Sequence, residues 1–458
     1  MTTLYRARWV LPRPSELIED GAVAVRGAEI VAVGAGDEVA ARFPGARVAE
    51  FGAAVILPGL VNCHTHLELT AMRGFLEPEE GNFFAWLKKL TLARTFRMSE
   101  EDLYVSAAWG AVEAARAGIT CVGDACSMAT HSMRALRDVG LRGVVYQEVF
   151  GPDARLAHEQ FVRLREQVEG LRGGETELVT LGISPHAPYT VSAPLIRLVA
   201  DYARTENLPL MMHAAESHDE NLLLLEGRGI FADSLRERGI EWSAPGVSTI
   251  QYLARLGLLD THALLAHCVR ADASDIETLR ASGAGVAHCP KSNAKLGHGR
   301  APFAAFLDAG LKVGLGSDSV GSNNTCDLLE EARFATLLSR AACDTRADGR
   351  TLDASDALRA ATEGGALALN IAGTTGRLTE GAPADLVVVA LDGAHQLPTY
   401  DPARTLVFSS NGRDVLLTMV AGREIFRDGR VQTVDEDALR AHLRDLARRL
   451  SHDSTERE

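Results

Sequence analysis

Two histidines separated by one residue, His64 and His66, follow an apolar run that spans residues 55–62. In a β-strand, side chains two residues apart point to the same side, so both imidazoles would project together. Imidazole nitrogen is a common protein ligand for zinc and related divalent cations. The pair therefore indicates half of a metal site, provided that the rest of the chain supplies further ligands.

Polar residues that can bind metals or transfer protons also follow most of the later apolar runs. In chain order they are His186, His213, Glu216, His267, His288 and Asp318. Three neutral imidazoles and one carboxylate suit a divalent cation such as zinc, or alternatively iron, with one position left for water. A second metal would need a bridging carboxylate, for which Glu148 is the only candidate in the middle of the chain. We therefore predict one metal ion, zinc in preference to iron, bound by His64, His66, His213 and Asp318.

The elements that must position these residues are short apolar runs separated by amphipathic helical segments. The runs cover residues 55–62, 119–124, 143–149, 178–184, 208–212, 263–267, 285–288 and 312–317. Strand runs that alternate with helices favour parallel strands with helical crossovers. Eight such units predict an α/β protein with a (β/α)₈ TIM barrel, in which functional residues follow the strands. A doubly wound open sheet would instead favour a glycine-rich turn after its first strand, where this chain has His64 and His66.

Both ends of the chain show a different pattern, in which short runs of alternating apolar and polar residues are separated by glycine turns. Such runs, which predict short strands, cover residues 5–10, 22–26 and 29–33 at the start and residues 386–390, 415–420 and 423–426 near the end. We predict that both ends build one small β-sandwich satellite domain. The predicted divisions are 1–56 and 379–432 for the sandwich, 57–378 for the metal-binding barrel, and 433–458 for a C-terminal helix and tail.

Composition excludes several classes of function. The 47 lysines and arginines against 61 aspartates and glutamates give a formal net charge of −14, which disfavours nucleic acid and anionic membranes as partners. The seven cysteines lack the paired spacing of a zinc ribbon or a disulfide framework. No apolar run approaches the roughly 20 residues of a membrane span, and the N-terminus does not resemble a signal peptide. We expect a cytoplasmic enzyme that acts on a small molecule and can form a homo-oligomer.

Several motifs, in this order along nearly the whole chain, resemble the amidohydrolase superfamily. They are residues 57–66 (LPGLVNCHTH), 213–216 (HAAE), 265–268 (LAHC), 288–293 (HCPKSN), 316–318 (GSD) and 381–387 (GAPADLV). The chain is most similar to the mononuclear aminohydrolases and chlorohydrolases, which act on ring C–N or C–Cl bonds. The resemblance implies the same four metal ligands. It also implies that Asp318 and His267 orient the attacking water, and that Glu216 protonates the ring nitrogen and later the departing ammonia.

Further motifs look most similar to the aminodeoxyfutalosine deaminases of menaquinone biosynthesis. They cover residues 67–69, 84–87, 184–190 and 226–259. Deaminases of methylthioadenosine or adenosylhomocysteine usually carry a ribose-binding acid nine residues after the tryptophan that corresponds to Trp86, and Thr95 occupies that position here. The expected reaction is therefore hydrolytic deamination of a 6-aminopurine nucleoside-like compound. Aminodeoxyfutalosine is the favoured substrate, and the methylthioadenosine/adenosylhomocysteine activity is the alternative.

Two other functions remain as alternatives. A triazine-type hydrolase would release chloride or an alkylamine, but Glu216 argues against chloride, which leaves without a proton. A metal-free scaffold protein would have lost metal ligands, and this chain retains all four.

Five residues near the strand ends are candidates for substrate binding, namely Glu68, Arg73, Trp86, His186 and Asn293. Trp86 would stack on a purine or fill the barrel rim. Glu68 and Arg73 would either contact the substrate or serve the local structure. The planar guanidinium of Arg73 would suit a carboxylate on the substrate. His186, at a strand end, favours a substrate contact over a place in the core.

Overall fold

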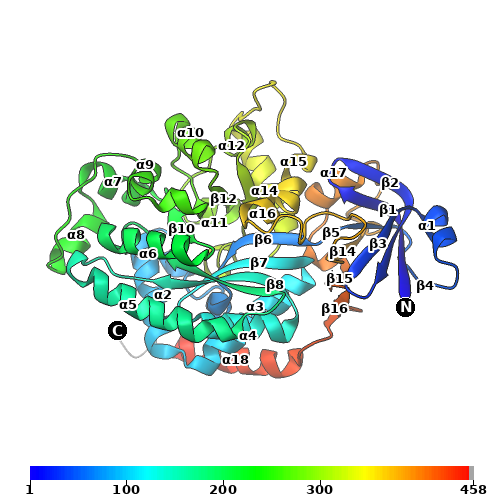
Figure 1. The fold of residues 1–458 in the computed structure, drawn as a ribbon, viewed down its shortest axis with the longest axis horizontal. Helices are drawn as coiled ribbons and strands as arrows, with labels where there is room; N and C mark the ends of the chain where they lie inside the picture. Colours follow the sequence, from blue (N-terminus) through cyan, green and yellow to red (C-terminus); the bar gives the residue numbers. More distant parts are fainter. Residues whose placement is uncertain (453–458) are drawn as a thin grey trace.

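Eight short parallel strands form the centre of the structure, a computed structural model that describes residues 1–452 (Figure 1). They are β6 (Leu60–Thr65), β7 (Ile119–Cys126), β8 (Arg142–Val149), β9 (Val179–Pro185), β10 (Met211–Ala214), β11 (Leu264–His267), β12 (Gly285–His288) and β13 (Lys312–Leu315). They pair in sequence order as two four-stranded sheets, β6–β9 and β10–β13. Single parallel bridges, Thr65 with Asp318 and Ile183 with Leu210, link the two sheets at both seams. This arrangement fits a (β/α)₈ barrel.

Each of the eight predicted runs contains a strand of this unit, but the first run is divided at Gly59. Its first half is β5 (Ala54–Pro58), which pairs with strands of the satellite and not with the parallel unit. Thr120 occupies the place where a side chain at position 59 would lie, so only glycine allows the close approach to β7. The satellite therefore extends to Pro58, beyond the predicted boundary at residue 56.

The helices lie outside the parallel strands (Figure 1). They are α2 (Phe83–Arg97), α3 (Glu100–Arg116), α4 (Ala129–Val139), α5 (Ala157–Leu171), α6 (Ala193–Glu206), α7 (His218–Glu226), α8 (Ile230–Glu237), α9 (Thr249–Arg255), α10 (Ala273–Ser282), α11 (Pro290–Lys295), α12 (Phe303–Asp308), α13 (Val320–Asn323), α14 (Leu328–Ala341), α15 (Ala354–Ala360) and α16 (Glu363–Ala368). Within residues 1–452, no helix combines the length and apolar character needed to cross a membrane.

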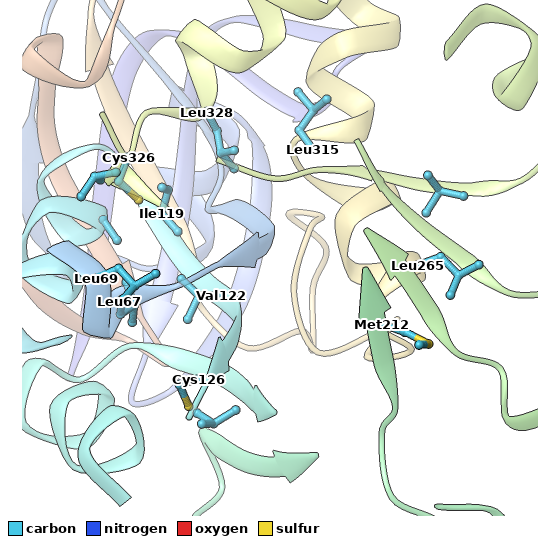
Figure 2. Packing of buried hydrophobic residues seen from close by; sticks show 14 of the residues in the cluster. Leu67, Leu69, Ile119, Val122, Cys126, Met212, Leu265, Leu315, Cys326 and Leu328 are labelled. Carbon is cyan, nitrogen blue, oxygen red and sulfur yellow. The ribbon is translucent and has the colours of Figure 1, made fainter. Parts of the chain in front are cut away.

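Alternate residues of the parallel strands belong to different hydrophobic cores. Val122, Met212 and Leu265 belong to the large core that also includes residues of the surrounding helices (Figure 2). Their sequence neighbours, such as Cys121 and Ala266, belong to a smaller core whose members come mainly from the strands. Six of the seven cysteines are buried thiols and Cys343 is exposed. Two of the buried cysteines, Cys63 and Cys121, belong to this smaller core, where they pack as small apolar side chains.

The satellite is one continuous sheet of nine strands built from both ends of the chain. Its strands are β1 (Thr2–Arg13), β2 (Glu16–Arg26), β3 (Glu29–Ala35), β4 (Arg47–Glu50), β5, β14 (Leu386–Ala390), β15 (Val415–Val420), β16 (Arg423–Arg427) and β17 (Arg430–Val431). The helix α1 (Gly36–Arg42) packs on this sheet, whereas α17 (Pro402–Phe408) packs on α14 and α15. All nine strands belong to one hydrogen-bonded sheet because β5 pairs with β1 on one side and with β14 on the other. Residues of both chain ends, including Val23, Ile56 and Val388, share one core, as expected for a single β-rich satellite.

The last helix, α18 (Glu436–His452), packs on α3 (Figure 1). Asp102, in the first turn of α3, accepts hydrogen bonds from His442 Nε2 at 2.7 Å and from Arg449 Nη1 at 3.1 Å. It also accepts a bond from the backbone N–H of Ser99, which completes a capping box. One buried carboxylate therefore joins the C-terminal helix to the body of the protein. The helix agrees with the prediction, and the predicted tail at residues 453–458 lies outside the described part of the chain.

Replacing Asp102 with asparagine should destabilise the protein at neutral pH by roughly 1.5–3 kcal/mol, the range for hydrogen bonds to a charged group. Burial alone would raise the pKa of Asp102, but the bonds from Arg449, His442 and Ser99 outweigh it and hold that pKa well below its usual value. A depressed carboxyl pKa stabilises the fold above the unfolded-state value near pH 4, and this stabilisation is lost as the pH falls through the folded-state value. Denaturant unfolding of both proteins between pH 7 and pH 3 should show the difference shrinking below about pH 4.

The matched control is Glu101→Gln, which removes the neighbouring exposed carboxylate and should leave the free energy of unfolding unchanged at every pH. A difference between wild type and Asp102→Asn that stayed constant down to pH 3 would contradict the role assigned to the charge.

Candidate active site

The four predicted metal ligands come together where the parallel strands end. His64 lies on β6 and His66 directly follows it, His213 lies on β10, and Asp318 follows β13. Asp318 Oδ1 lies 3.4 Å from His64 Nε2 and 3.5 Å from His66 Nε2. The Nε2 atoms of His66 and His213 are 3.2 Å apart. His64 and Asp318, which are more than 250 positions apart in the chain, thus lie next to each other.

The donor atoms of this group fit a divalent metal ion. Both ring nitrogens of His64 are buried and have no hydrogen-bond partner among the described residues. Burial lowers the pKa of His64, His66 and His213, to about 3 for His66, so all three imidazoles are neutral at pH 7 and each has a free lone pair. Two ligands of a tetrahedral zinc ion lie roughly 3.3 Å apart, which matches the spacing of His66 and His213.

Neighbouring groups orient two of these ligands. His213 Nδ1 donates to the backbone carbonyl of His186 at 2.9 Å, which leaves Nε2 deprotonated and directed at the cluster. Asp318 Oδ2 accepts hydrogen bonds from the hydroxyls of Ser292 at 2.6 Å and Ser322 at 2.8 Å. Only Oδ1 of Asp318 is then left to face the histidines.

The backbone adopts the left-handed conformation at several site residues that are not glycine. The φ angles are 52° at Ala215, 73° at His267, 48° at Cys268 and 56° at Asp318. Such angles cost roughly 1–3 kcal/mol each and persist only where the surrounding structure imposes them. Hydrogen bonds between adjacent strand ends do so here, including Asp318 N to His64 O at 2.9 Å and Cys268 N to Ala214 O at 3.0 Å.

Glu216 and His267 form a second pair beside the metal ligands. His267 Nε2 lies 3.5 Å from Glu216 Oε1, and His298 Nε2 lies 3.6 Å from the same oxygen. Burial raises the pKa of Glu216 to about 7, although His267 opposes this. Burial alone would lower the pKa of His267, but the carboxylates of Glu216 and Asp318 raise it. Glu216 can therefore gain and lose a proton near neutral pH, as a proton shuttle requires.

His267 also approaches the metal ligands, because its ligand atom lies within 4.8 Å of those of His64 and His213. Its other ring nitrogen, Nδ1, is held by Asn293 Oδ1 at 2.9 Å. Glu220, at the start of α7, fixes the backbone next to the pair by accepting from the N–H groups of Ala215 and Glu216. Asn293 and Glu220 thus fix the surroundings of the Glu216–His267 pair from both sides.

A cavity of about 420 Å³ opens beside these groups and has aromatic and aliphatic walls. Its lining includes His66, His213, Glu216, His267 and Asp318 together with Phe83, Trp86, Leu87, Leu90, Arg94, Glu148, Phe150, His186, Tyr189 and Arg238. The volume lies within the range of pockets that enclose small-molecule ligands. The site therefore combines the four predicted metal ligands, the Glu216–His267 pair and a pocket of substrate size.

Comparison with known proteins identifies the family. The sequence profile described as the amidohydrolase family matches residues 55–425. The chain belongs to the amidohydrolase family. It is accordingly a hydrolytic enzyme that acts on C–N bonds other than peptide bonds.

Two curated relatives of this amidohydrolase are 5-methylthioadenosine/S-adenosylhomocysteine deaminases. The protein of Pelotomaculum thermopropionicum is 32% identical over 439 residues, which cover 95% of each chain. That of Syntrophobacter fumaroxidans is 33% identical and the match covers 94% of this chain and 93% of the relative. Among solved structures, a zinc-bound adenosine deaminase from Xanthomonas campestris has a TM-score of 0.85 at 29% identity over 98% of both chains. Atrazine chlorohydrolase TrzN from Arthrobacter aurescens, complexed with zinc, has a TM-score of 0.82 at 24% identity, covering 97% of this chain and 100% of TrzN.

The five candidate substrate-binding residues of this amidohydrolase occupy different places. Trp86 and His186 line the cavity. Asn293 is buried and holds His267. Glu68 is buried outside the lining, where it accepts hydrogen bonds from Ser127 and Arg94, and Arg73 forms an ion pair with Glu113 outside the lining. The structure thus gives Glu68 and Arg73 protein partners in place of direct access to the cavity.

Sequence reasoning assigned no role to Arg94 and Tyr189, which line the cavity, or to His298, whose Nε2 lies 3.6 Å from Glu216 Oε1. Arg94 follows Trp86 and Leu90 at intervals of four residues, so helical periodicity places all three on one face of α2. Tyr189 lay within a recognised motif but was assigned no role. His298 lies in the loop after α11, where Phe83 packs edge-on against its ring at 4.5 Å. No pattern in the sequence signals this last contact.

Proposed function

We propose that this amidohydrolase removes the 6-amino group of a purine nucleoside-like compound by hydrolysis and releases ammonia. The observation that carries the proposal is the position of Glu216, which is buried 3.5 Å from His267 and lines the cavity beside the metal-binding cluster. Attack on the carbon of a ring amidine requires proton delivery to the adjacent ring nitrogen and to the leaving amine. A carboxyl whose pKa is about 7 can do both.

The residues divide the work as follows. A divalent cation, for which we propose zinc, would supply water that is acidic enough to react at neutral pH. Asp318 and His267 lie on either side of the position of the attacking water and orient it toward the ring carbon by hydrogen bonds. Glu216 gives the proton at Oε1 to the ring nitrogen and then takes up, in turn, the two protons that the attacking water loses. It passes one of them to the departing amine, which leaves as ammonia, and keeps the other. The aromatic walls, among them Trp86, exclude bulk water and contact the purine faces.

Aminodeoxyfutalosine, an intermediate of menaquinone biosynthesis, is the substrate that we favour. The motifs at residues 67–69, 84–87 and 184–190 support it because they resemble deaminases of that compound. The absence of the ribose-binding acid at Thr95 also supports it, and Thr95 is exposed and outside the cavity lining. That position therefore offers no substrate contact in this chain.

Methylthioadenosine and adenosylhomocysteine are the second candidates, favoured by the curated relatives that match over more than nine-tenths of the chain. Both candidates share the 6-aminopurine nucleoside and differ in the group attached at the 5′ position. The resemblance to triazine hydrolases is below 25% identity for TrzN and shows the fold alone.

Release of ammonia, measured together with the absorbance change from 6-aminopurine to hypoxanthine, tests the proposal. We expect kcat/KM for aminodeoxyfutalosine to exceed the values for methylthioadenosine and adenosylhomocysteine at least tenfold. A tenfold advantage of either of the other two would assign the second activity. If the zinc-loaded protein deaminated no 6-aminopurine nucleoside, the proposed function would be rejected.

A further inference from the structure

One wall of the cavity contains a guanidinium whose N–H groups are only partly engaged in hydrogen bonds with the protein. The Arg94 side chain on α2 is 13% exposed and lines the cavity. Its Nη1 donates to Glu68 Oε1 at 3.3 Å and lies 4.0 Å from Glu148 Oε2. Among residues 1–452, neither Nε nor Nη2 of Arg94 has a hydrogen-bond acceptor. Because the same side chain borders the cavity, these N–H groups are available to a ligand.

Glu148, near the end of β8, is the second feature of this wall. Its side chain is 2% exposed and also lines the cavity. Its Oε1 has no hydrogen-bond partner among the described residues, although a buried polar atom without a partner costs roughly 1–3 kcal/mol. An unsatisfied carboxyl oxygen and unused guanidinium donors thus border the same space.

A second metal ion is one candidate occupant, because ligand atoms of Glu148, His186 and His213 lie within 4.8 Å of one another. However, His213 Nδ1 is bound to the carbonyl of His186, and its Nε2 belongs to the first cluster. The Nδ1 of His186 forms a hydrogen bond with Thr190 Oγ1 at 2.8 Å. Glu148 and one nitrogen of His186 would remain for a second cation, fewer than the three or four protein ligands of a typical site.

The charge balance of this wall also disfavours an anion. The single positive charge of Arg94 is flanked by two carboxyl groups, Glu68 and Glu148. A hydroxyl group fits better, since it donates one hydrogen bond and accepts others. Two adjacent hydroxyls of a sugar would satisfy both the donors of Arg94 and the acceptor of Glu148. Phe150, whose ring lies 5.8 Å from the Arg94 guanidinium, adds an apolar surface for the carbon face of the sugar.

We propose that Arg94 and Glu148 form a subsite that binds the two neighbouring hydroxyls of the substrate's ribose. Arg94 donates to the hydroxyl oxygens, and the Glu148 carboxyl oxygen accepts a hydroxyl proton. The inference rests on the proposed nucleoside deaminase function and adds to it the part of the substrate that this wall recognises. The enzyme should therefore discriminate ribonucleosides from their deoxy analogues.

The test compares kcat/KM for the best nucleoside substrate and its 2′,3′-dideoxy analogue in wild type, Arg94→Met and Glu148→Met. Wild type should prefer the ribonucleoside by about 100-fold, because a hydrogen bond to the charged Arg94 guanidinium contributes roughly a 10- to 100-fold effect. Each variant should lose about 10- to 100-fold on the ribonucleoside and little on the dideoxy analogue, so the preference collapses. Lys88→Met is the matched control, since Lys88 is exposed on the same helix outside the lining.

Other outcomes would overturn the subsite. One is that both variants keep the wild-type preference for the ribonucleoside. Another is that a variant loses kcat/KM equally on the ribonucleoside and on the dideoxy analogue, because equal losses would indicate a general structural role. Loss of a second metal ion per chain in Glu148→Met would assign this wall to a metal. Selective loss of carboxylate-bearing substrates in Arg94→Met would assign it to an anion. If wild type turned over neither the ribonucleoside nor the dideoxy compound, the proposed function itself would fail, and the measured metal content would show whether the protein was intact.

Discussion

Glu216→Gln should lower kcat by about 10²- to 10⁴-fold or more, while the metal content and substrate binding remain those of wild type. Glutamine keeps the size and hydrogen-bonding shape of the side chain but cannot carry the proton. The carboxyl lies 3.5 Å from His267 and is not one of the four predicted metal ligands, so its loss should affect chemistry and not assembly. Steady-state kinetics, metal analysis and a binding measurement with substrate test the three parts separately.

Glu226→Gln, at the exposed C-terminal end of α7, is the matched control and should retain wild-type turnover. The assignment of Glu216 to proton transfer would be refuted if Glu216→Gln kept wild-type kcat, or if it lost metal to the same extent as a ligand variant.

Asp318→Ala should lose the metal and, with it, nearly all activity. The substitution removes the only carboxylate of the four-ligand set and the acceptor of the Ser292 hydroxyl. Because even partners that only orient a ligand contribute 10- to 100-fold to metal affinity, we expect the affinity to fall by at least about 100-fold. Elemental analysis after dialysis should find one zinc ion per wild-type chain and much less than one in the variant.

The same measurement decides between an enzyme and a metal-free scaffold, and between zinc and iron. Asp260→Ala, which removes an exposed carboxylate, should keep the full metal content. Wild-type protein that neither contained nor rebound a stoichiometric divalent ion would contradict the metal site.

The sequence was enough to predict that the four candidate metal ligands lie close together, because their order relative to the strands determines where the fold places them. Parallel strands that alternate with helices place all their C-terminal ends at one edge, so residues that follow each apolar run become neighbours. His64 and Asp318 are far apart in sequence, but their strands meet at a seam, where Asp318 N donates to His64 O. The periodicity of apolar residues was enough to reveal this, since each strand is buried and bounded by polar residues.

Other features depend on contacts that a local pattern does not contain. Residue 59, where the first predicted run divides, must be glycine because Thr120, some 60 residues later, leaves no room for a side chain. Arg73 looked suitable for a carboxylate, yet it reaches Glu113 on α3 instead. The contact of His298 with Glu216 depends on the path of a loop. Arg94 differs from these cases, because its helical spacing from Trp86 could have drawn attention to it.

The pairing of β5 between β1 and β14 has a consequence for how the protein is made on the ribosome. β5 leads through Gly59 directly into β6 and the first two histidines, so it anchors the strand that carries them. One neighbour of β5 is synthesised before it, but the other, β14, begins only at Leu386. At roughly 5–20 residues per second, the anchor stays half-paired for roughly 15 s to a minute of translation. During that interval the exposed edge of β5 is open to pairing with other nascent chains, so premature termination before residue 386 should yield aggregation-prone fragments.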